Sequence, residues 1–374
     1  MRCYSYRYSY RSALLTLMLS ALCIESQATT HSLGIQRKLY GESIAYDMNA
    51  SGQVAAVIKE KNGISHAVVL DKGKLTRLEG DGESESEAKR INEKGEIIGS
   101  AKRDGIWRAF IYSNANGRRE IASLGGRHSY GAALNNSGTA VGFSDTPDGD
   151  WHAFIQKDGK AVQDLGTLGG KVSYASSINA RDQVVGTAMD SEGYRHAFLY
   201  DEATGMRDLG TLGGKLSTAT ALNDHGVVVG SSETKDRRWH AFIHDGTRMV
   251  DLGAKIGFGD SFATGINNQG HVVGIVDVPD MRLAFVWRDN KMILHPSGKS
   301  LYLTNAINNQ GHVIGASYDR GLNAATMPSN SVPFVDYGGS KILGFNMVFF
   351  GLALLMAIFR KRLKGIFYSD RLPG

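Results

Sequence analysis

A repeat of about 44 residues constrains this chain more than any other feature. Residues 164–179 read DLGTLGGKVSYASSIN, and the sequence starts again at 208–223 with DLGTLGGKLSTATALN. The Asn that ends this pattern marks seven copies, spaced by 43, 43, 44, 44, 44 and 41 residues. The seven marks are Asn49, Asn92, Asn135, Asn179, Asn223, Asn267 and Asn308. Internal copies this close indicate an array of similar structural units.

A second mark gives the same period independently. It is the Ala of an HAF-like tripeptide, at Ala67, Ala109, Ala153, Ala197, Ala241, Ala284 and Ala324. Each copy contains four short stretches rich in β-branched and aromatic residues, as in residues 173–179, 183–189 and 195–200 and the stretch that begins at Met206. Such stretches predict strands. Turn signals separate them, for example the Asn-x-x-Gly of residues 135–138.

Four strands and their connections account for a period of about 40 to 45 residues, which is typical of a propeller blade. We therefore predict an all-β fold, a seven-bladed β-propeller over residues 29–327. The last copy lacks a fourth strand after 322–327, and a strand-like segment, Gly34–Leu39, precedes the first copy. We expect this N-terminal segment to complete the last blade, because a closed ring leaves no free edge strand.

The two ends of the chain differ from the repeats. Residues 1–28 combine a basic start, an apolar run and small residues before Thr29, which predicts a signal peptide. Residues 342–359 form an apolar run of 18 residues, followed by a basic segment at 360–374. This pattern predicts a single transmembrane helix with a cytoplasmic tail, joined to the propeller by a polar stalk at 328–341. The propeller is then expected outside the cytoplasm, at the cell envelope.

Charge and cysteine content narrow the function. The formal net charge is +5, of which residues 1–28 contribute +2 and residues 360–374 contribute +4, leaving about −1 for the remainder. A propeller of that charge is not expected to bind nucleic acid. Both cysteines, Cys3 and Cys23, lie in the predicted signal peptide. The mature protein therefore has no disulfide, no thiol nucleophile and no cysteine metal site.

The units DLGTLGG, INNQGHVVG and HAF resemble the HAF repeats of bacterial extracytoplasmic proteins. The tripeptide is complete at residues 152–154, 196–198 and 240–242, and the resemblance covers roughly residues 33–325. It implies an exported or surface repeat protein and carries no catalytic residues with it.

The repeated polar residues allow two interpretations. His152, His196 and His240 occupy one position of the repeat, so a ring of metal ligands is conceivable. A side chain that recurs in successive blades more commonly packs between them, and we expect this role for the histidines. We expect turn and inter-blade hydrogen bonds for the repeated Asn and for the Asp of DLG, rather than calcium binding. No metal and no cofactor is expected.

The connections between second and third strands vary most among the copies, and in propellers they share one face with the connections between blades. On this predicted rim, variable loops on a rigid scaffold favour recognition. The candidate binding residues are the aromatics Trp107, Trp151, Tyr194 and Trp239, the basic residues Arg127, Lys171 and Lys215, and the acidic residues Asp148, Glu192, Asp236 and Asp280. The alternative is a solvated rim whose tryptophans pack down on the blades.

No catalytic motif is present in the sequence, and we name no catalytic residue. We predict a monomeric, non-enzymatic binding or adhesion scaffold for a protein or glycan partner. The alternative is a carbohydrate-active enzyme, a hydrolase or lyase, that uses rim carboxylates as acid and base.

Overall fold

The computed structural model describes residues 30–35, 41–279, 281–296, 301–318 and 321–329. The predicted signal peptide, transmembrane helix and basic tail lie outside these residues, as does the stalk beyond residue 329. Within the described ranges, no helix is both long enough and apolar enough to cross a membrane.

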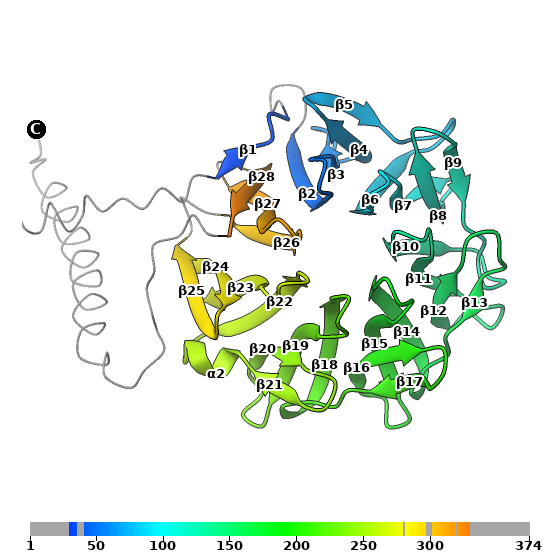
Figure 1. The fold of residues 1–374 in the computed structure, drawn as a ribbon. Coiled ribbons are helices and arrows are strands. Elements are labelled where there is room, and N and C mark those ends of the chain that lie inside the picture. The colour runs from blue at the N-terminus through cyan, green and yellow to red at the C-terminus, as the bar shows by residue number, and fades with distance from the viewer. Residues whose placement is uncertain (1–29, 36–40, 280, 297–300, 319–320, 330–374) are drawn as a thin grey trace, which may run out of the picture. The chain divides into compact units, whose positions relative to one another are not determined.

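The described chain is built almost entirely of strands, whose sheets are arranged around a central axis (Figure 1). The strands nearest the axis are β2 (Glu42–Met48), β6 (Glu85–Ile91), β10 (Ser129–Leu134), β14 (Gly169–Ile178), β18 (Gly213–Leu222), β22 (Asp260–Ile266) and β26 (Leu303–Ile307). The second strands are β3 (Val54–Lys59), β7 (Ile97–Arg103), β11 (Ala140–Asp145), β15 (Val184–Asp190), β19 (Val228–Thr234), β23 (Val272–Val278) and β27 (His312–Tyr318).

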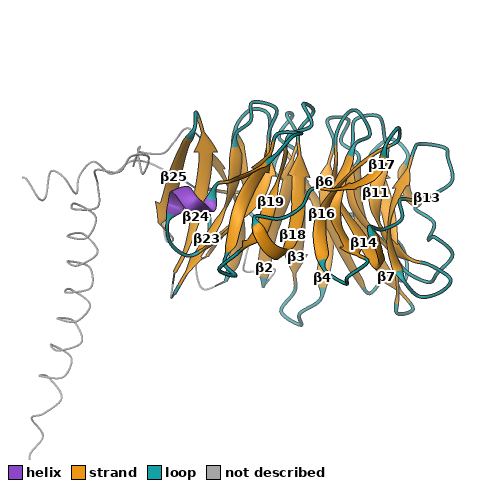
Figure 2. Cartoon of the chain, turned by 90° about the horizontal axis from the view of Figure 1, so that it is seen from below, coloured by secondary structure: helices purple, strands orange, loops and turns teal. Residues whose placement is uncertain are grey.

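The third strands carry the HAF-like tripeptides. They are β4 (Ser65–Asp71), β8 (Ile106–Ser113), β12 (Trp151–Gln156), β16 (Arg195–Asp201), β20 (Trp239–His244), β24 (Met281–Arg288) and β28 (Leu322–Pro328). The outer strands are β5 (Lys74–Arg77), β9 (Gly117–Glu120), β13 (Gln163–Asp164), β17 (Gly205–Asp208), β21 (Met249–Asp251), β25 (Lys291–Pro296) and β1 (His31–Ser32). One short helix, α2 (Gly253–Ile256), follows β21. Figure 2 shows the strands running between two faces of loops.

Within the described residues, antiparallel pairing joins these strands in groups of four, in the order first, second, third and outer. One parallel bridge between Trp151 and Val172 links two neighbouring groups into an eight-stranded sheet. The strands predicted in the copy around Asn179 are confirmed as β14 to β17, with small shifts at their ends.

The Asn at the end of each first strand closes the turn that follows, and in the first six copies its side-chain nitrogen also reaches the next sheet. In the third sheet, the Asn135 side-chain oxygen accepts hydrogen bonds from the backbone N–H groups of Ser137 and Thr139. Its side-chain nitrogen donates to the carbonyl oxygen of Asn179, 3.1 Å away in the neighbouring sheet. The turn requires a positive φ at Gly138, where φ is 83°. The expected turn role of these Asn residues is confirmed, and so is the inter-blade role except at Asn308, whose side-chain nitrogen has no partner within the described residues.

The Phe of the HAF-like tripeptide fills the core between sheets. The five equivalent side chains, Phe110, Phe154, Phe198, Phe242 and Phe285, are completely buried. Phe198 lies against Gly186 of β15, where a Cβ would be 2.9 Å from the ring and 2.0 Å from the carbonyl oxygen of Tyr174. The Gly of the VVG segment is therefore needed because ring and backbone approach it closely.

A second contact that joins neighbouring sheets repeats along the chain. The backbone N–H of the tripeptide Ala donates to a serine hydroxyl on the first strand of the next sheet, as Ala197 does to Ser217 at 2.8 Å. The other donor and acceptor pairs are Ala67 with Ser86, Ala109 with Ser129, Ala153 with Ser173, Ala241 with Ser261, and Ala324 with Ser43. These serines are almost completely buried. The buried Ala N–H groups therefore depend on the adjacent sheet for their hydrogen-bond acceptor.

We expect Ser217→Ala to lower the free energy of unfolding by about 1–3 kcal/mol, because it leaves the buried Ala197 N–H without an acceptor. Ser176→Ala, on the same strand type but bordering the central cavity, is the matched control and should cost less. Chemical denaturation of both variants measures the difference. Equal losses in the two variants would contradict the proposed role of the Ser217 hydroxyl.

The N-terminal segment completes the last sheet, but with other residues than expected. β1, His31–Ser32, pairs antiparallel with β28, with His31 opposite Thr326. The predicted strand Gly34–Leu39 is wrong at its start, because Gly34 has a φ of 70° and its N–H turns back to the Ser32 hydroxyl. Residues 36–40 lie outside the described ranges. Leu33 extends the pairing by one backbone hydrogen bond, from its N–H to the carbonyl oxygen of Ala324 at 3.2 Å, and the side chains of Leu33 and Ile35 pack against the core.

Candidate functional site

The predicted aromatic residues occupy equivalent positions at the start of the third strands. Trp107 lies near the start of β8, Trp151 and Trp239 begin β12 and β20, and Tyr194 directly precedes β16. All four side chains are half-buried. Part of each side chain packs on its blade and part is exposed to solvent. These residues are therefore neither fully packed down on the blades nor fully solvated.

Two of these tryptophans meet in one cluster of rings. Tyr130 of β10 lies between them, with ring centroids 5.6 Å from Trp107 and 5.8 Å from Trp151. Phe143 of β11 stacks on Tyr130 at 5.0 Å, and Tyr174 of β14 meets the edge of Phe143 at 5.1 Å. We call these five residues the aromatic surface. It spans three adjacent sheets, and each ring is half-buried.

Three members of the aromatic surface were missing from the sequence-based candidates. Tyr130 and Tyr174 share one register in the SY pairs of β10 and β14, and Phe143 replaces the smaller residue of the VGT and VGS segments. Their side chains come from the first and second strands rather than from the variable loops. The register of Tyr130 and Tyr174 was the available signal, because it places both side chains at the same level of neighbouring blades.

The remaining aromatic candidates form separate pairs. Lys215 lies 4.4 Å from the ring centroid of Tyr194 and donates a hydrogen bond to its hydroxyl oxygen. Trp239 stacks on Phe262 of β22 with 6.2 Å between ring centroids. The structure therefore divides the predicted rim into groups instead of one continuous surface.

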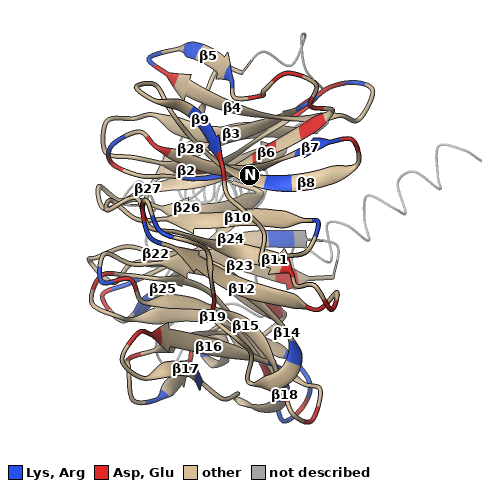
Figure 3. Cartoon of the chain, turned by 90° about the vertical axis from the view of Figure 1, so that its right-hand side faces the viewer, with Lys and Arg blue, Asp and Glu red and all other residues tan. Residues whose placement is uncertain are grey.

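The charged candidates are solvated. Arg127, Lys171, Asp148, Glu192 and Asp236 are exposed. A hydrogen bond from the Thr234 hydroxyl, 2.6 Å away, holds the pKa of Asp236 below its usual value. Asp280 lies outside the described residues. Figure 3 shows basic and acidic residues interspersed along the loops and strand ends of the side in view.

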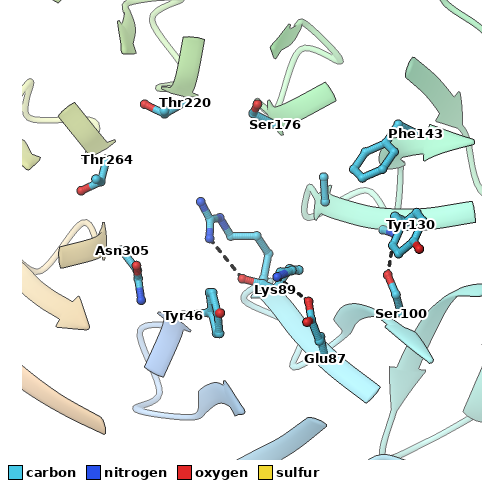
Figure 4. A pocket seen from close by; sticks show the side chains of 13 residues that line it. Tyr46, Glu87, Lys89, Ser100, Tyr130, Phe143, Ser176, Thr220, Thr264 and Asn305 are labelled. Carbon is cyan, nitrogen blue, oxygen red and sulfur yellow. Dashed lines mark hydrogen bonds and ion pairs between the residues drawn. The ribbon is translucent and has the colours of Figure 1, made fainter. Parts of the chain in front are cut away.

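A central cavity of about 550 Å³ adjoins the aromatic surface. The strands nearest the axis, from β2 to β26, contribute side chains to it, and Tyr130 and Phe143 belong to both the cavity and the aromatic surface (Figure 4). Burial raises the pKa of the Tyr130 phenol, and the carboxylates of Glu87 and Asp145 add to this effect. The phenol is therefore a hydrogen-bond donor at neutral pH.

The charges of the cavity come from β6. Lys89 forms an ion pair with Glu87, with 2.6 Å between Nζ and Oε2, and lies 4.7 Å from the ring centroid of Tyr46. Arg90 donates one hydrogen bond, from Nη1 to the carbonyl oxygen of Lys89 at 3.1 Å. Among the described residues, no carboxylate lies within salt-bridge distance of the Arg90 guanidinium.

A smaller cavity of about 190 Å³ is lined by the Asn residues of the turns and by Asp47 and Glu93. Burial raises the pKa of Asp47, while Arg90 and the Ile91 N–H act in the opposite direction. Asp47 accepts from the Ile91 N–H at 3.1 Å, and Glu93 accepts from the Ala50 N–H at 2.9 Å. Both carboxylates thus join neighbouring sheets.

The repeated histidines each contact the Asp of the following DLG unit. His152 Nδ1 lies 2.7 Å from Asp164, His196 Nδ1 lies 2.7 Å from Asp208, and His240 Nδ1 lies 2.8 Å from Asp251. These contacts connect the third and outer strands of one blade. No group of three His, Cys, Asp or Glu side chains that could hold a metal occurs in the described ranges.

No protein-family model matches the chain. No curated protein sequence matches it either.

Solved structures do match it. The β-propeller domain of the trilobed protease from Pyrococcus furiosus aligns with a TM-score of 0.54 at 12% identity, over 79% of this chain and 100% of that one. A puromycin-hydrolysing peptidase of Mycobacterium tuberculosis aligns with a TM-score of 0.53 at 11% identity, over 83% of this chain and 56% of that one. TolB from Acinetobacter baumannii aligns with a TM-score of 0.46 at 14% identity, over 70% of this chain and 65% of that one.

This chain therefore spans less than two thirds of the peptidase and of TolB. Identities this low bear on the fold and not on the activity. The alignments with the two peptidase structures, at TM-scores of 0.54 and 0.53, together with the sheets described above, show that the chain has a β-propeller fold.

Proposed function

We propose that this protein is a seven-bladed β-propeller of the HAF repeat type, exported and anchored at the bacterial cell envelope, that binds a glycan without transforming it. Seven copies in the sequence and the grouping of the described strands in fours support the blade number. The apolar and basic segments at the chain ends support export and anchoring.

The aromatic surface is the observation that carries the binding role. Its five rings lie at centroid distances of 5.0–5.8 Å and are held on adjacent sheets, so they are positioned before a ligand arrives. Rigid aromatic groups give a large contact area at a small cost in conformational entropy.

A glycan suits this surface better than a protein does. The faces of sugar rings carry C–H groups that pack on flat aromatic rings, and their hydroxyls need nearby polar partners. The aromatic surface continues into a cavity lined by the hydroxyls of Ser176, Thr220 and Thr264. A protein partner commonly binds a patch of exposed, large apolar side chains. Within the described residues, the large apolar side chain that is exposed is Tyr318, which belongs to another sheet.

We expect Trp151→Ala to weaken glycan binding by about 10-fold or more, because truncation of a central aromatic anchor commonly costs about 2 kcal/mol. Trp239→Ala is the matched control: it is the same change at the equivalent position of another blade, outside the aromatic surface. A glycan array with the full chain identifies the bound class, and titration calorimetry measures both variants.

If Trp151→Ala binds every captured glycan as tightly as the unmodified chain, the aromatic surface is not the binding site. Capture of an envelope protein, with no glycan bound, would favour a protein partner instead.

A carbohydrate-active enzyme is the second candidate, and the raised pKa of Asp47 beside Glu93 favours it. Incubation of a bound glycan with the protein tests this role. Cleavage products that disappear in Asp47→Asn would replace the binding proposal with the enzymatic one.

A further inference from the structure

The Arg90 guanidinium is the unusual group of the central cavity. An arginine side chain has five N–H donors, and one of them is used within the described residues, in the bond to the Lys89 carbonyl. The neighbouring Glu87 is already paired with Lys89. The Asp47 carboxylate reduces the positive electrostatic potential of Arg90. Its oxygen Oδ2 accepts a hydrogen bond from the Ile91 N–H. The cavity therefore presents a cation with unused donors.

The opposite wall offers hydrogen-bond acceptors without charge. The Thr220 hydroxyl donates to the carbonyl oxygen of Ala263 at 2.8 Å, so its oxygen can still accept. The Asn305 side-chain nitrogen donates to the Ala45 carbonyl at 2.8 Å, which leaves the side-chain oxygen as an acceptor. Figure 4 shows Thr220, Thr264 and Asn305 on one side of the cavity and Tyr130 and Phe143 on the other.

The aromatic surface and this cavity have two residues in common. Tyr130 and Phe143 line the cavity, and the centroid of each ring lies 5.8 Å from the ring centroid of Trp151. A chain of sugars that packs on Trp151 can therefore extend over these two rings toward the axis. A volume of about 550 Å³ is enough for a terminal sugar residue.

We propose that the central cavity binds a carboxylated terminal sugar of the glycan, with its carboxylate on Arg90 and its hydroxyls on the neutral wall. This inference rests on the proposed glycan-binding function and names the chemical class of its ligand. A planar guanidinium pairs with a carboxylate through two parallel N–H···O bonds, which a neutral sugar cannot form.

The test compares oligosaccharides that end in a uronic acid with the same oligosaccharides after reduction of the carboxyl group to an alcohol. Affinities for the full chain are measured by titration calorimetry. The acidic form is expected to bind about 10- to 100-fold more tightly, because a charge-assisted hydrogen bond contributes more than a neutral one. Arg90→Gln should remove this preference, whereas Arg103→Gln, an exposed arginine at the end of β7, should retain it.

Ser176→Asp provides a second variant, in case Arg90→Gln disturbs folding. It adds a carboxylate to the neutral wall and should weaken acidic ligands selectively by repulsion. Trp151→Ala should weaken both forms alike, because it acts on the packing of the sugar chain.

Equal binding of the acidic and reduced forms, or an unchanged preference in a folded Arg90→Gln, would overturn the assignment of the cavity while leaving the glycan-binding function intact. Binding of neither form, with no glycan captured on an array, would overturn both proposals.

Discussion

Replacing Phe198 with alanine should lower the free energy of unfolding by about 3–5 kcal/mol, the range found when a fully buried Phe is truncated. Phe198 is completely buried and packs against Gly186 of the neighbouring strand. The cavity left behind cannot close readily, because the facing backbone is already held by the pairing of β14 with β15. Denaturant unfolding of the full chain measures the loss.

Phe143→Ala is the matched control for this prediction. It removes the same side chain from a half-buried position that borders the central cavity, so it should cost clearly less. If both variants lose the same free energy, the HAF phenylalanine does not have the special packing role that its repetition indicates.

Acid should destabilise the fold through His295 before the ordinary carboxylates protonate. The side chain is 2% exposed, on β25, and burial lowers its pKa to about 4, with a smaller contribution from Arg288. An unfolded His has a pKa of about 6.5, so between pH 6.5 and 4 the unfolded chain binds the proton more readily than the folded one. The stability due to neutral His295 is therefore complete above pH 6.5 and is lost as the pH falls toward 4, by about 3 kcal/mol at most.

The variant His295→Leu should flatten this pH dependence, because the unfolded chain then has one fewer proton site. Unfolding free energies from pH 7 to 4 test this in the unmodified chain and the variant. Burial also lowers the pKa of His244, so a smaller slope of the same sign should persist in the variant. Identical slopes in both proteins would show that His295 does not titrate in this window.

Much of the fold could be predicted because each repeat carries its own structural signals. The Asn-x-x-Gly turns, the β-branched second strands and the HAF third strands act through local geometry and occur in successive copies. The N-terminal strand was predicted too late in the sequence, at Gly34–Leu39, whereas His31–Ser32 pair with β28. A positive φ at Gly34 interrupts the extended backbone, and the side chain of Ile35 packs against the core.

The candidate site was less predictable, because it depends on which side chains meet between blades. The sequence indicated Trp107 and Trp151 but gave no reason to separate them from Trp239. Tyr130 brings the first two together, whereas Phe262 engages the third. Arg90 was overlooked because one basic residue among many has no distinct sequence pattern, and its importance arises from the lack of a nearby ion-pair partner among the described residues.

The amino-acid sequence by itself determined the repeat, its turns and its four strands, since these follow from local backbone preference and from a period that recurs along the chain. Only the tertiary structure decided that His31–Ser32 pairs with β28, that five rings from three sheets form one surface, and that Arg90 faces a neutral wall across a cavity. The reason is physical: such contacts join residues from different copies of the repeat, and their distances depend on how the sheets are placed around the axis.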